Sequence, residues 1–517
     1  MRASASHVVG AAVVALLALP LAAVAERATS APLERPSVRF DPEAFSELDA
    51  RLHRQLVLEQ AEAGLDDPLE IRVGKHARAR LARTIEGERP IRVGTKRRVG
   101  LSLDFASETQ PFGAARVTSD GGFVWTGVVR SPHATALRVE LRGVDLPVGH
   151  ELWVYGPEGQ ARGPYTGRGP GGSGAFWTHT IFGSELILQL RSPALQEPAA
   201  RFTLARVGHM GPKFRLPAYA RGERADGFTA EAFCSFNESC VENVNCSSPD
   251  PAVAAARDAV AQILFPSQGG FFICSGGLMA DTDTQTVREL FLTANHCISR
   301  GSEAAGSESF FQFEVNCNAS CVPFDNGSFP SVAGATILKG GKKADYTLME
   351  LAGPAPAGSA YLGWNSADVA NANGTALFRI SHPGGAPQAY SEHVVDTSAP
   401  TCGGWPRGAR IYSRDVFGAT EGGSSGSPVV NGAGEVVGQL SGACGFNVGD
   451  VCDAESNATV DGAFANYFSQ VQDILDPGTG GGETCTPGSL PKGSSCTADS
   501  QCQSCKCKGP NGNKSCK

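Results

Sequence analysis

The spacing of apolar residues changes near residue 97, and the change predicts two different structures in the first part of the chain. Within residues 42–69 apolar positions recur at helical spacing, as Phe45, Leu48, Leu52, Leu56 and Leu58. Arg and Glu are frequent around them, so we expect a leader helix with a basic tail over residues 26–96. From residue 97 onward short apolar runs lie between Gly, Pro and Asp turns; examples are 122–125, 137–141, 152–155 and 186–190. These runs predict a β-sandwich over residues 97–228.

Two further regions follow, and their composition separates them. Residues 229–477 contain many short apolar runs separated by Gly and Asn, which predicts a second all-β domain of barrel size. A helix over residues 461–475 is expected to close this domain. Residues 478–484 are Gly-rich and predict a flexible linker, and residues 485–517 form a short Cys-rich module.

Length and composition agree with a mainly β chain of about three domains. The 517 residues include 63 Gly and 32 Pro, while charged residues make up only 19%. Such a composition is rich in turn formers and poor in the residues that fill long helices. Lys and Arg number 44 against 52 Asp and Glu, which gives a net charge of -8, so no overall basic field favours nucleic acid as a partner.

The N-terminus has the pattern of a signal peptide. Arg2 precedes an apolar run over residues 8–21, and the small residues 23–25 form a cleavage site before Glu26. The run is shorter than the roughly 20 residues that cross a bilayer, so we prefer cleavage to a signal anchor. No later segment is apolar enough to span a membrane. The sequence therefore predicts removal of residues 1–25 and a secreted, extracellular protein.

The cysteines support export and mark a domain boundary. All 16 lie at or after Cys234, so neither the leader nor the sandwich contains one. That many cysteines are unusual in a reducing cytosol and common where disulfides persist. We place the boundary near residues 217–227. The cysteines of residues 485–517 predict a disulfide-bonded module, with metal binding through Cys502 and Cys505 as the alternative.

A Gly/Ser loop at residues 420–428 offers a nucleophile. It places Ser425 between Gly423 and Gly426, close to the apolar residues 429–430. Small neighbours allow a substrate carbonyl to approach the backbone, where the N–H groups of Gly423 and Ser425 can stabilise an oxyanion. Taken alone, such a loop is more often structural.

Two further residues complete the requirements of amide hydrolysis. His296 ends an apolar, strand-like run, and His382 and His393 are the other histidines of residues 229–477. Asp345 begins another apolar run. An acid at the start of a strand can be buried against an imidazole N–H, where it fixes the tautomer and stabilises the imidazolium. A nucleophile, a base and an orienting acid together favour a hydrolase over a structural loop.

Four segments, taken in order, resemble the chymotrypsin-like serine proteases, and most closely their secreted bacterial branch typified by lysyl endopeptidase. The segments are residues 274–279, 293–297, 345–348 and 420–428. The resemblance implies two six-stranded β-barrels with the site in the cleft between them. It implies His296 as general base, Asp345 as its orienting acid and Ser425 as nucleophile. The N–H groups of Gly423 and Ser425 would form the oxyanion hole, with no metal or other cofactor.

The same resemblance implies disulfides. It pairs Cys274 with Cys297 across the segment that leads to His296, and a loop of that size contributes about 3 kcal/mol in the chain-entropy account of disulfide stabilisation. The other implied pairs are Cys234 with Cys444, and Cys240 with Cys317 or Cys321, while Cys246, Cys402 and Cys452 have no assigned partner.

One departure from the family concerns activation. Animal digestive relatives carry an aspartate directly before the nucleophile, which pairs with a newly cut N-terminal amine, but this chain has Ser424 there. That salt bridge is therefore unavailable. We expect control by removal of a pro-region, residues 26 to about 228, that blocks the cleft or assists folding. The alternative is that the sandwich is retained as a binding module.

A second departure concerns specificity. A trypsin-like pocket has an acid six residues before the nucleophile, where this chain has Ala419, and alignment with lysyl endopeptidases puts Thr459 where their acid lies. Asp453 and Asp461 remain candidates for the pocket. A buried aspartate there would favour a Lys or Arg side chain through charge-assisted hydrogen bonds, whereas solvated acids would leave the pocket apolar.

Other residues are expected around the cleft. Ser441 and Gly442 are expected to form the edge that pairs with the substrate backbone by strand addition. Residues 382–385, which match a motif of the bacterial branch, are expected to line the cleft without taking part in proton transfer. Trp405 either walls the cleft or packs in the core.

The sequence thus favours a secreted serine endopeptidase that acts on polypeptides through an acyl-enzyme and is made as a precursor. A Lys or Arg preference is one open outcome. The alternative from another class is a non-catalytic secreted binding or adhesive protein on a protease scaffold. The presence of His296, Asp345 and Ser425 together argues against that alternative. In both cases the Cys-rich tail is a candidate for binding a surface or polymer.

Overall fold

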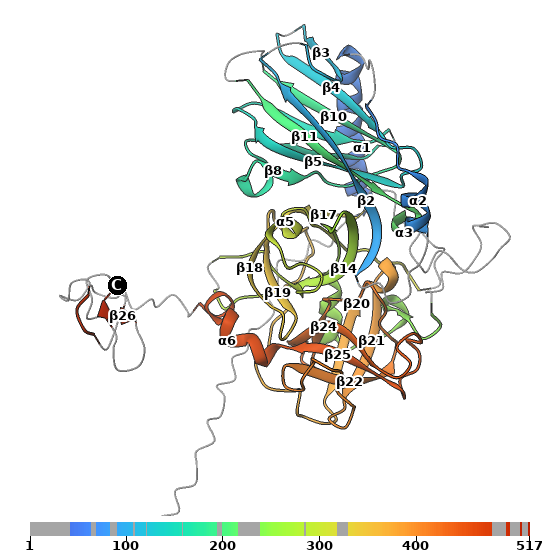
Figure 1. Ribbon diagram of the computed structural model, residues 1–517, viewed down its shortest axis with the longest axis vertical. Helices are drawn as coiled ribbons and strands as arrows, with labels where there is room; N and C mark the ends of the chain where they lie inside the picture. The colour runs from blue at the N-terminus through green and yellow to red at the C-terminus, as the bar shows by residue number, and fades with distance from the viewer. Residues whose placement is uncertain are drawn as a thin grey trace, which may run out of the picture.

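The computed structural model describes most of the chain, in ranges separated by gaps. The described residues are 42–63, 69–82, 90–106, 109–119, 121–157, 159–193, 199–215, 238–283, 286–317, 329–477, 493–496, 507–508 and 515–516. The predictions for the signal peptide, for the boundary near residues 217–227 and for most of the linker and tail fall outside these ranges. In the described part a β-sandwich lies against a larger unit of two β-barrels (Figure 1).

The N-terminal part is the predicted β-sandwich, built from two facing sheets. One has the strand order β1–β4–β10–β6–β7, with β3 on β4, and the other has β2–β11–β5–β8, with β9 on β5. Apolar side chains of both sheets, such as Trp125, Leu141 and Leu188, meet in one core. The strands are β1 (Leu69–Glu70), β2 (Ile91–Asp104), β3 (Ala114–Val117), β4 (Phe123–Arg130), β5 (Ala136–Asp145), β6 (Glu151–Tyr155), β7 (Ala161–Tyr165), β8 (Ala175–Trp177), β9 (Ile181–Phe182), β10 (Glu185–Ser192) and β11 (Arg201–Met210), with the short helices α2 (Lys75–Ala82), η1 (Pro170–Gly172) and α3 (Pro212–Arg215).

Helix α1 (Pro42–Ala63) is the predicted leader helix, and it packs on the sandwich. Leu56 is 2% exposed and lies in a cluster with Trp153 of β6. Leu48 and Leu58 also match the helical spacing, but they are exposed because only one side of the helix touches the sheet.

The predicted pair of β-barrels follows. In the first, the order β17–β16–β13–β14–β15–β19–β18 nearly closes; in the second, β21–β20–β23–β24–β25–β22 closes into a ring because β22 also pairs with β21. The first barrel has β13 (Val260–Ser267), β14 (Gly270–Leu278), β15 (Leu290–Ala294), β16 (Glu308–Phe311), β17 (Ser331–Ala333), β18 (Ala335–Gly341) and β19 (Tyr346–Leu351). The second has β20 (Ala376–Ser381), β21 (Ala389–Val395), β22 (Arg410–Phe417), β23 (Pro428–Val430), β24 (Val436–Gly445) and β25 (Asn457–Ala463), with β12 (Glu242–Asn243) along β21.

The closing helix begins later than the sequence suggested. Helix α6 (Phe464–Leu475) is preceded directly by β25, so Asp461 belongs to a strand and not to the helix. The helix packs against both barrels: the ring of Tyr467 stacks on Tyr346 of the first with centroids 3.9 Å apart, and its hydroxyl donates to Gln439 of β24 in the second at 2.6 Å. The remaining short elements are η3 (Val244–Cys246), α4 (Pro251–Ala254), η4 (Ala255–Asp258), α5 (Gly301–Ala304), η5 (Pro383–Gly385) and the tail strands β26 (Cys507–Lys508) and β27 (Ser515–Cys516).

Strand β2 belongs to both halves of the molecule (Figure 1). Along most of its length it pairs with β11 of the sandwich. Its first residues also pair antiparallel with β14 of the first barrel, where Ile91 lies opposite Ile273 and Arg92 opposite Phe272. One continuous sheet therefore runs from the sandwich into the first barrel, and the division that we expected between residues 96 and 97 falls inside a single strand.

The rest of the junction between sandwich and barrel is closely packed. The rings of Trp177 and Phe271 meet edge to face with centroids 4.9 Å apart. A buried ion pair crosses the junction: Arg138 Nε lies 3.5 Å from Glu308 Oε2, and the two side chains are 0% and 1% exposed. Thr180 donates to the same oxygen from its N–H and its hydroxyl, at 2.9 and 2.6 Å. The junction has the character of a domain core.

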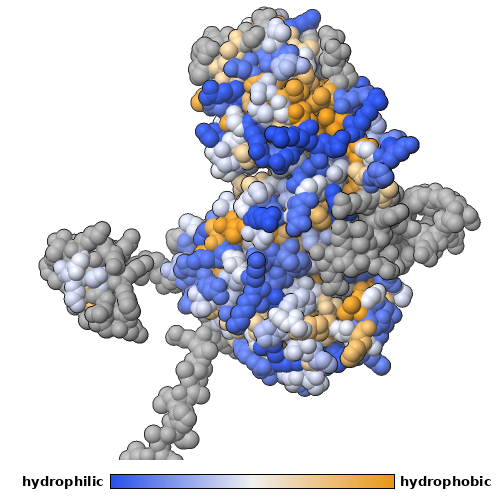
Figure 2. Space-filling model, in the orientation of Figure 1, coloured by the Kyte–Doolittle hydropathy of each residue, from blue (hydrophilic) through white to orange (hydrophobic). Residues whose placement is uncertain are grey.

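The outer surface is largely polar. Figure 2 shows hydrophilic residues over most of the face drawn, on the sandwich and on the barrels, with scattered apolar patches between them. Within the described ranges, no helix combines the length and the apolar character that crossing a membrane requires.

The disulfide beside the site is the one that we predicted, whereas the other predicted pairs differ from those observed. Cys274 is bonded to Cys297, the pair implied by the family resemblance. Cys444 is bonded to Cys402, so the expected pair with Cys234 is wrong. The segment before β22 folds back over the end of β24, and both cysteines of the actual pair border one apolar cluster there.

The expected pairing of Cys240 is also wrong. Cys240 is bonded to Cys452, and Cys246 takes Cys317 as its partner instead. The short strand β12 lies between Cys240 and Cys246 and pairs with β21 of the second barrel. The Cys240 end of this segment therefore reaches the second barrel, while the Cys246 end stays near the end of the first. Cys321 lies outside the described residues.

Candidate active site

Two neighbouring strands of the first barrel bring His296 and Asp345 together. β15 ends at Ala294 and β19 begins at Tyr346, and these two residues are paired across the antiparallel strands. Beyond this pair the N–H of Asn295 donates to the carbonyl oxygen of Asp345 at 2.9 Å. His296 is the next residue, so its side chain lies beside the carboxylate.

The Asp345 carboxylate holds His296 at two points. His296 Nδ1 lies 2.7 Å from Asp345 Oδ2, and the backbone N–H of His296 donates to Oδ1 at 2.8 Å. Asp345 has a φ of 55°, a region that residues with a side chain seldom adopt, so the backbone is held in an uncommon conformation at this point. Its side chain is 9% exposed against 28% for His296, which leaves the imidazole accessible and the acid shielded.

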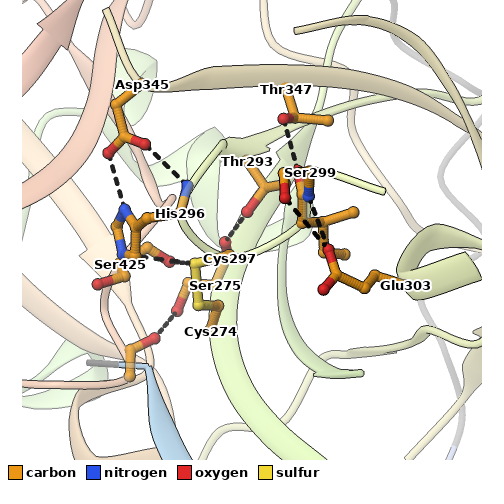
Figure 3. Close-up of a disulfide and its surroundings, with 12 residues drawn as sticks. Cys274, Ser275, Thr293, His296, Cys297, Ser299, Glu303, Asp345, Thr347 and Ser425 are labelled. Atoms are coloured by element: carbon orange, nitrogen blue, oxygen red, sulfur yellow. Dashed lines mark hydrogen bonds and ion pairs between the residues drawn. A yellow bond between two sulfur atoms is a disulfide. The ribbon is translucent and has the colours of Figure 1, made fainter. Parts of the chain in front are cut away.

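Ser425 approaches from the second barrel. It lies in the loop between β22 and β23, and Figure 3 shows it beside the imidazole of His296. Ser275 of β14 anchors this loop to the first barrel: its N–H donates to the Ser425 carbonyl at 2.8 Å, and its hydroxyl donates to the Gly423 carbonyl at 2.9 Å. The structure thus brings the three predicted residues together from three separate elements.

The N–H groups of Gly423 and Ser425 have no hydrogen-bond acceptor in the described part of the chain. Gly423 has a φ of 99°, and a Cβ at this position would lie 2.7 Å from the carbonyl oxygen of His382. The adjacent carbonyl of Gly422 accepts from the N–H of Gly384 at 2.6 Å. The turn is therefore pressed against η5, in a shape that leaves both predicted oxyanion donors available.

His382 supports this turn from behind. Its ring is buried, stacks on Phe313 with centroids 5.9 Å apart, and has Nδ1 2.9 Å from the carbonyl oxygen of Ala386. Burial lowers the pKa of His382 to about 4, so the ring is neutral near neutral pH. The ring packs inside the barrel unit, and only the backbone of this motif borders the nucleophile loop.

The disulfide between Cys274 and Cys297 lies next to the imidazole (Figure 3). Cys297 Sγ is 3.7 Å from His296 Nε2 and 3.7 Å from the carbonyl oxygen of Ser425. The two sulfurs and the imidazole are grouped as closely as metal ligands. Both sulfurs are bonded to each other, however, so they offer no thiolate to a metal. The group fixes the position of the histidine relative to the loop.

Neither aspartate that we expected to set specificity has the surroundings of a specificity residue. Asp461 of β25 forms an ion pair with Arg379 of β20 at 2.6 Å, and both side chains are 0% exposed, so its charge is neutralised inside the second barrel. Asp453 lies in the loop before β25. Hydrogen bonds from Asn447 and from Ser456 to its carboxylate lower the pKa of Asp453 and tie this loop together.

Ser441 and Gly442 lie at a bulge of β24. The register with β25 shifts between Leu440 and Gly442, so Ser441 has no partner in that ladder. On the opposite edge, pairing with β23 stops at Gln439. Among the described residues, no strand pairs with that edge at residues 441–443, which is the condition that strand addition by a substrate requires.

Arg410 is the main residue of the site that sequence reasoning missed. It begins β22 and is 3% exposed; its Nη1 lies 2.6 Å from Ser441 Oγ and 3.9 Å from Asp345 Oδ2. The ring of Trp405 covers the guanidinium at 5.4 Å, so this tryptophan packs on a site residue. One signal was present in the sequence, because an arginine that opens an apolar run is costly to bury unless its charge is paired.

A second polar group behind the loop was also missed. Thr459, which we expected at the position of a specificity acid from the family resemblance, donates to Asp415 Oδ1 at 2.6 Å. The same oxygen lies 2.7 Å from Nδ1 of the buried His393, whose Nε2 lies 2.9 Å from Ser391 Oγ. These residues come from three adjacent strands, so only closure of the barrel reveals the group.

Comparison with known proteins agrees with the fold and the geometry. Residues 236–458 match the family model described as lysyl endopeptidase, C-terminal domain. That range contains the first barrel, most of the second and the grouped residues His296, Asp345 and Ser425, so the match lies on the part of the chain that carries the site. More specifically, a lysyl endopeptidase of Pseudomonas aeruginosa is 30% identical over 308 residues. The match covers 58% of this chain and 63% of the relative, so the chain spans less than two thirds of that relative's length.

Two solved structures are similar at low identity. The inactive form of the Rv3671c protease of M. tuberculosis is 19% identical, with 44% of this chain and 98% of that chain covered and a TM-score of 0.28. The HtrA-type protease AlgW with a tripeptide is 15% identical, with 43% and 62% covered and a TM-score of 0.30. At these TM-scores neither likeness adds to the assignment.

Proposed function

We propose that the chain is the precursor of a secreted serine endopeptidase that hydrolyses peptide bonds through an acyl-enzyme at Ser425. The observation that supports this most directly is the position of His296, which Asp345 holds through the imidazole and through the backbone N–H, and which lies beside Ser425. Export fits four disulfides among the described residues, since disulfides persist in oxidising compartments. Polypeptides are the proposed substrates. A preference for Lys or Arg is left out of the proposal, because Asp453 and Asp461, the candidates for it, have structural partners.

The proposed mechanism assigns a role to each group of the site, and His296 acts in turn as base and as acid. His296 Nε2 accepts the proton of the Ser425 hydroxyl while Oγ attacks the substrate carbonyl carbon. The N–H groups of Gly423 and Ser425 donate to the developing oxyanion, and Asp345 stabilises the imidazolium through Nδ1. The imidazolium gives its proton to the leaving amine, and the acyl group stays on Ser425. Water then attacks the acyl carbon while His296 Nε2 takes its proton. The imidazolium returns that proton to Ser425 Oγ as the ester bond breaks, which releases the acid product and restores the site.

The N-terminal region supports the precursor part of the proposal. Ile91, at the start of β2, is paired with Ile273, which directly precedes Cys274 of the site disulfide. On another side it touches the nucleophile loop, since a Cβ placed on Gly422 would lie 3.1 Å from Ile91 Cδ1. Ile91 therefore fills the space between the nucleophile loop and β14, next to the Ser425 loop. This position supports a precursor whose N-terminal region obstructs the site.

Fluorophosphonate labelling tests the catalytic part, because the reagent reacts with a serine that is activated by its base. The processed protein is expected to be modified at Ser425, as located by mass mapping. Labelling should disappear in Ser425→Ala and fall sharply in His296→Ala, while Ser427→Ala, in the same loop, keeps it. A folded, processed protein that takes no label would refute the proposal and favour the binding-protein hypothesis.

Peptide binding to the uncleaved chain tests the obstruction. A Ser425→Ala background prevents self-cleavage, and fluorescence anisotropy with labelled casein peptides reports access to the site. Ile91→Gly should bind the peptides several-fold more tightly than the parent. Val99→Gly, on the same strand beyond the residues that pair with β14, is the matched control and should not. Equal affinity of the Ile91 variant and its parent would remove this support for an inhibited precursor.

A further inference from the structure

Arg410 connects the two barrels at the site. Its Nη1 donates to Ser441 Oγ of β24, in its own barrel, at 2.6 Å. The same nitrogen lies 3.9 Å from Asp345 Oδ2, and Nη2 donates to the carbonyl oxygen of Lys342 at 3.3 Å; both contacts are to the turn before β19 of the first barrel. The Arg410 guanidinium therefore contacts the Asp345 carboxylate, the turn that carries Asp345, and Ser441 of the predicted substrate edge.

The guanidinium is desolvated, and its positive charge is balanced mainly by Asp345. Its Nε is buried without a hydrogen-bond partner in the described residues, and the Trp405 ring covers its face. Burial lowers the pKa of Arg410, while the carboxylates of Asp345 and Asp461 oppose that shift. Asp461 is already paired with Arg379 at 2.6 Å, so Asp345 is the carboxylate that remains to offset the charge.

Asp345 consequently stands between two groups that compete for one oxygen. Its Oδ2 lies 2.7 Å from His296 Nδ1 and 3.9 Å from Arg410 Nη1. A fixed positive charge at that oxygen makes a second one, on a protonated imidazole, less favourable. The other charged groups near this point in the described residues are Lys342 and Lys343 of the same turn and the Arg379–Asp461 pair, which is neutral as a unit.

We propose that Arg410 is a positioning residue for the proposed protease. It keeps Asp345 and Ser441 in register across the contact between the barrels, and it allows His296 to act as a base at lower pH than Asp345 alone would allow. The inference rests on the proposed function, which supplies the role of Asp345. An arginine that only stabilised the fold would change the amount of folded enzyme and leave the pH dependence unaltered.

The pH profile of kcat/KM, divided by the concentration of sites titrated with fluorophosphonate, tests the proposal. In Arg410→Met the acid limb should move to higher pH by about one unit, and KM should rise because Ser441 loses its donor. Arg410→Lys keeps the charge and should restore the acid limb. Arg414→Met is the matched control on the same strand: its guanidinium lies 2.6 Å from Asp396 instead, so the profile should stay in place.

An unchanged acid limb in Arg410→Met, at a normal concentration of titrated sites, would overturn the proposal. Where Arg410→Met does not fold, Arg410→Lys and Ser441→Ala test the proposal instead. Arg410→Lys should keep the acid limb of the kcat/KM profile at its wild-type pH, and Ser441→Ala should raise KM without moving that limb. A shifted limb in the lysine variant would then count against the charge effect. Failure of the parent enzyme to react with fluorophosphonate would refute the proposed function itself, whatever the Arg410 variants do.

Discussion

Gly426 lies where the nucleophile loop passes closest to the first barrel. Its φ is 85°, and a Cβ would lie 2.5 Å from the carbonyl oxygen of Ser275 and against the Thr293 hydroxyl. That hydroxyl donates to the same carbonyl at 2.8 Å, so a shift of either group breaks a buried hydrogen bond. The absence of a side chain at Gly426 therefore lets Ser425 approach His296.

Gly426→Ala is expected to destabilise the protein by about 2 kcal/mol or more and to remove most fluorophosphonate labelling. Gly403→Ala is the control, because no heavy atom lies within 4 Å of the added Cβ there. Urea unfolding and labelling would measure both effects. Similar stability of the two variants would mean that the loop yields more readily than these contacts suggest.

For single residues, the sequence predicts a site residue well when its motif is local. It predicts poorly when the side chain's partner lies far away along the chain. That His296, Asp345 and Ser425 lie together was predictable because each stands in a short motif with its own local turn or strand. The role of Asp461 was not, because its counterion Arg379 is 82 residues away and meets it only when the second barrel closes. A sequence shows the charge of an aspartate and hides the cation that neutralises it.

The sequence predicted the presence of the helices and sheets better than it predicted their boundaries and the strands that pair with them. The helical spacing of residues 42–69 indicated helix α1, and the sandwich and the paired barrels followed from short apolar runs and from family motifs. The boundaries at β2 and α6 were missed because strand pairing is non-local: residues 91–96 look like a basic leader until β14 provides their partner. In the same way Asp461 joins β25 because β22 and β24 flank it.

The packing of α1 on the sandwich predicts opposite effects for two leucines of one helix. Leu56→Ala should destabilise the sandwich by about 2–4 kcal/mol, because it empties a position that is 2% exposed. Leu58→Ala, at a position that is 72% exposed, should change stability by less than about 0.5 kcal/mol. Chemical unfolding of the Ser425→Ala chain would measure both. Equal effects would mean that the helix does not rest on the sheet through Leu56.

Three histidines shielded from solvent make the stability of the whole molecule depend on pH. Burial, the largest cause in each case, lowers the pKa of His179 and His209 in the sandwich and of His382 in the barrel unit to about 4. An unfolded histidine binds a proton near pH 6.5, so between about pH 6.5 and 4 the unfolded state holds more protons than the folded state. Stability should therefore fall as the pH falls through this window, and these three groups add no further loss below it.

Thermal melting of the Ser425→Ala chain between pH 7.5 and 4 would show this decline. His209→Asn should make the decline shallower, whereas the exposed His76→Asn should leave it unchanged. The same slope in all three proteins would mean that other groups, such as paired carboxylates, dominate the acid response.

The packing between sandwich and barrels determines whether the two parts separate when the chain is cut between them. With a recognition sequence for a site-specific protease placed between residues 215 and 238 of the Ser425→Ala chain, we expect the two parts to stay together on size exclusion after cutting. Glu308→Gln leaves Arg138 buried without a charged partner, at a cost of about 3–5 kcal/mol, and should let them separate. Glu185→Gln removes a more exposed ion pair within the sandwich and should not let them separate.

Separation of the unaltered parts would show that the packed core and β2 do not hold them. If they stay together, Ile91 remains beside Gly422 after the cut, and activation would require destruction of the sandwich as well as cleavage of the connection.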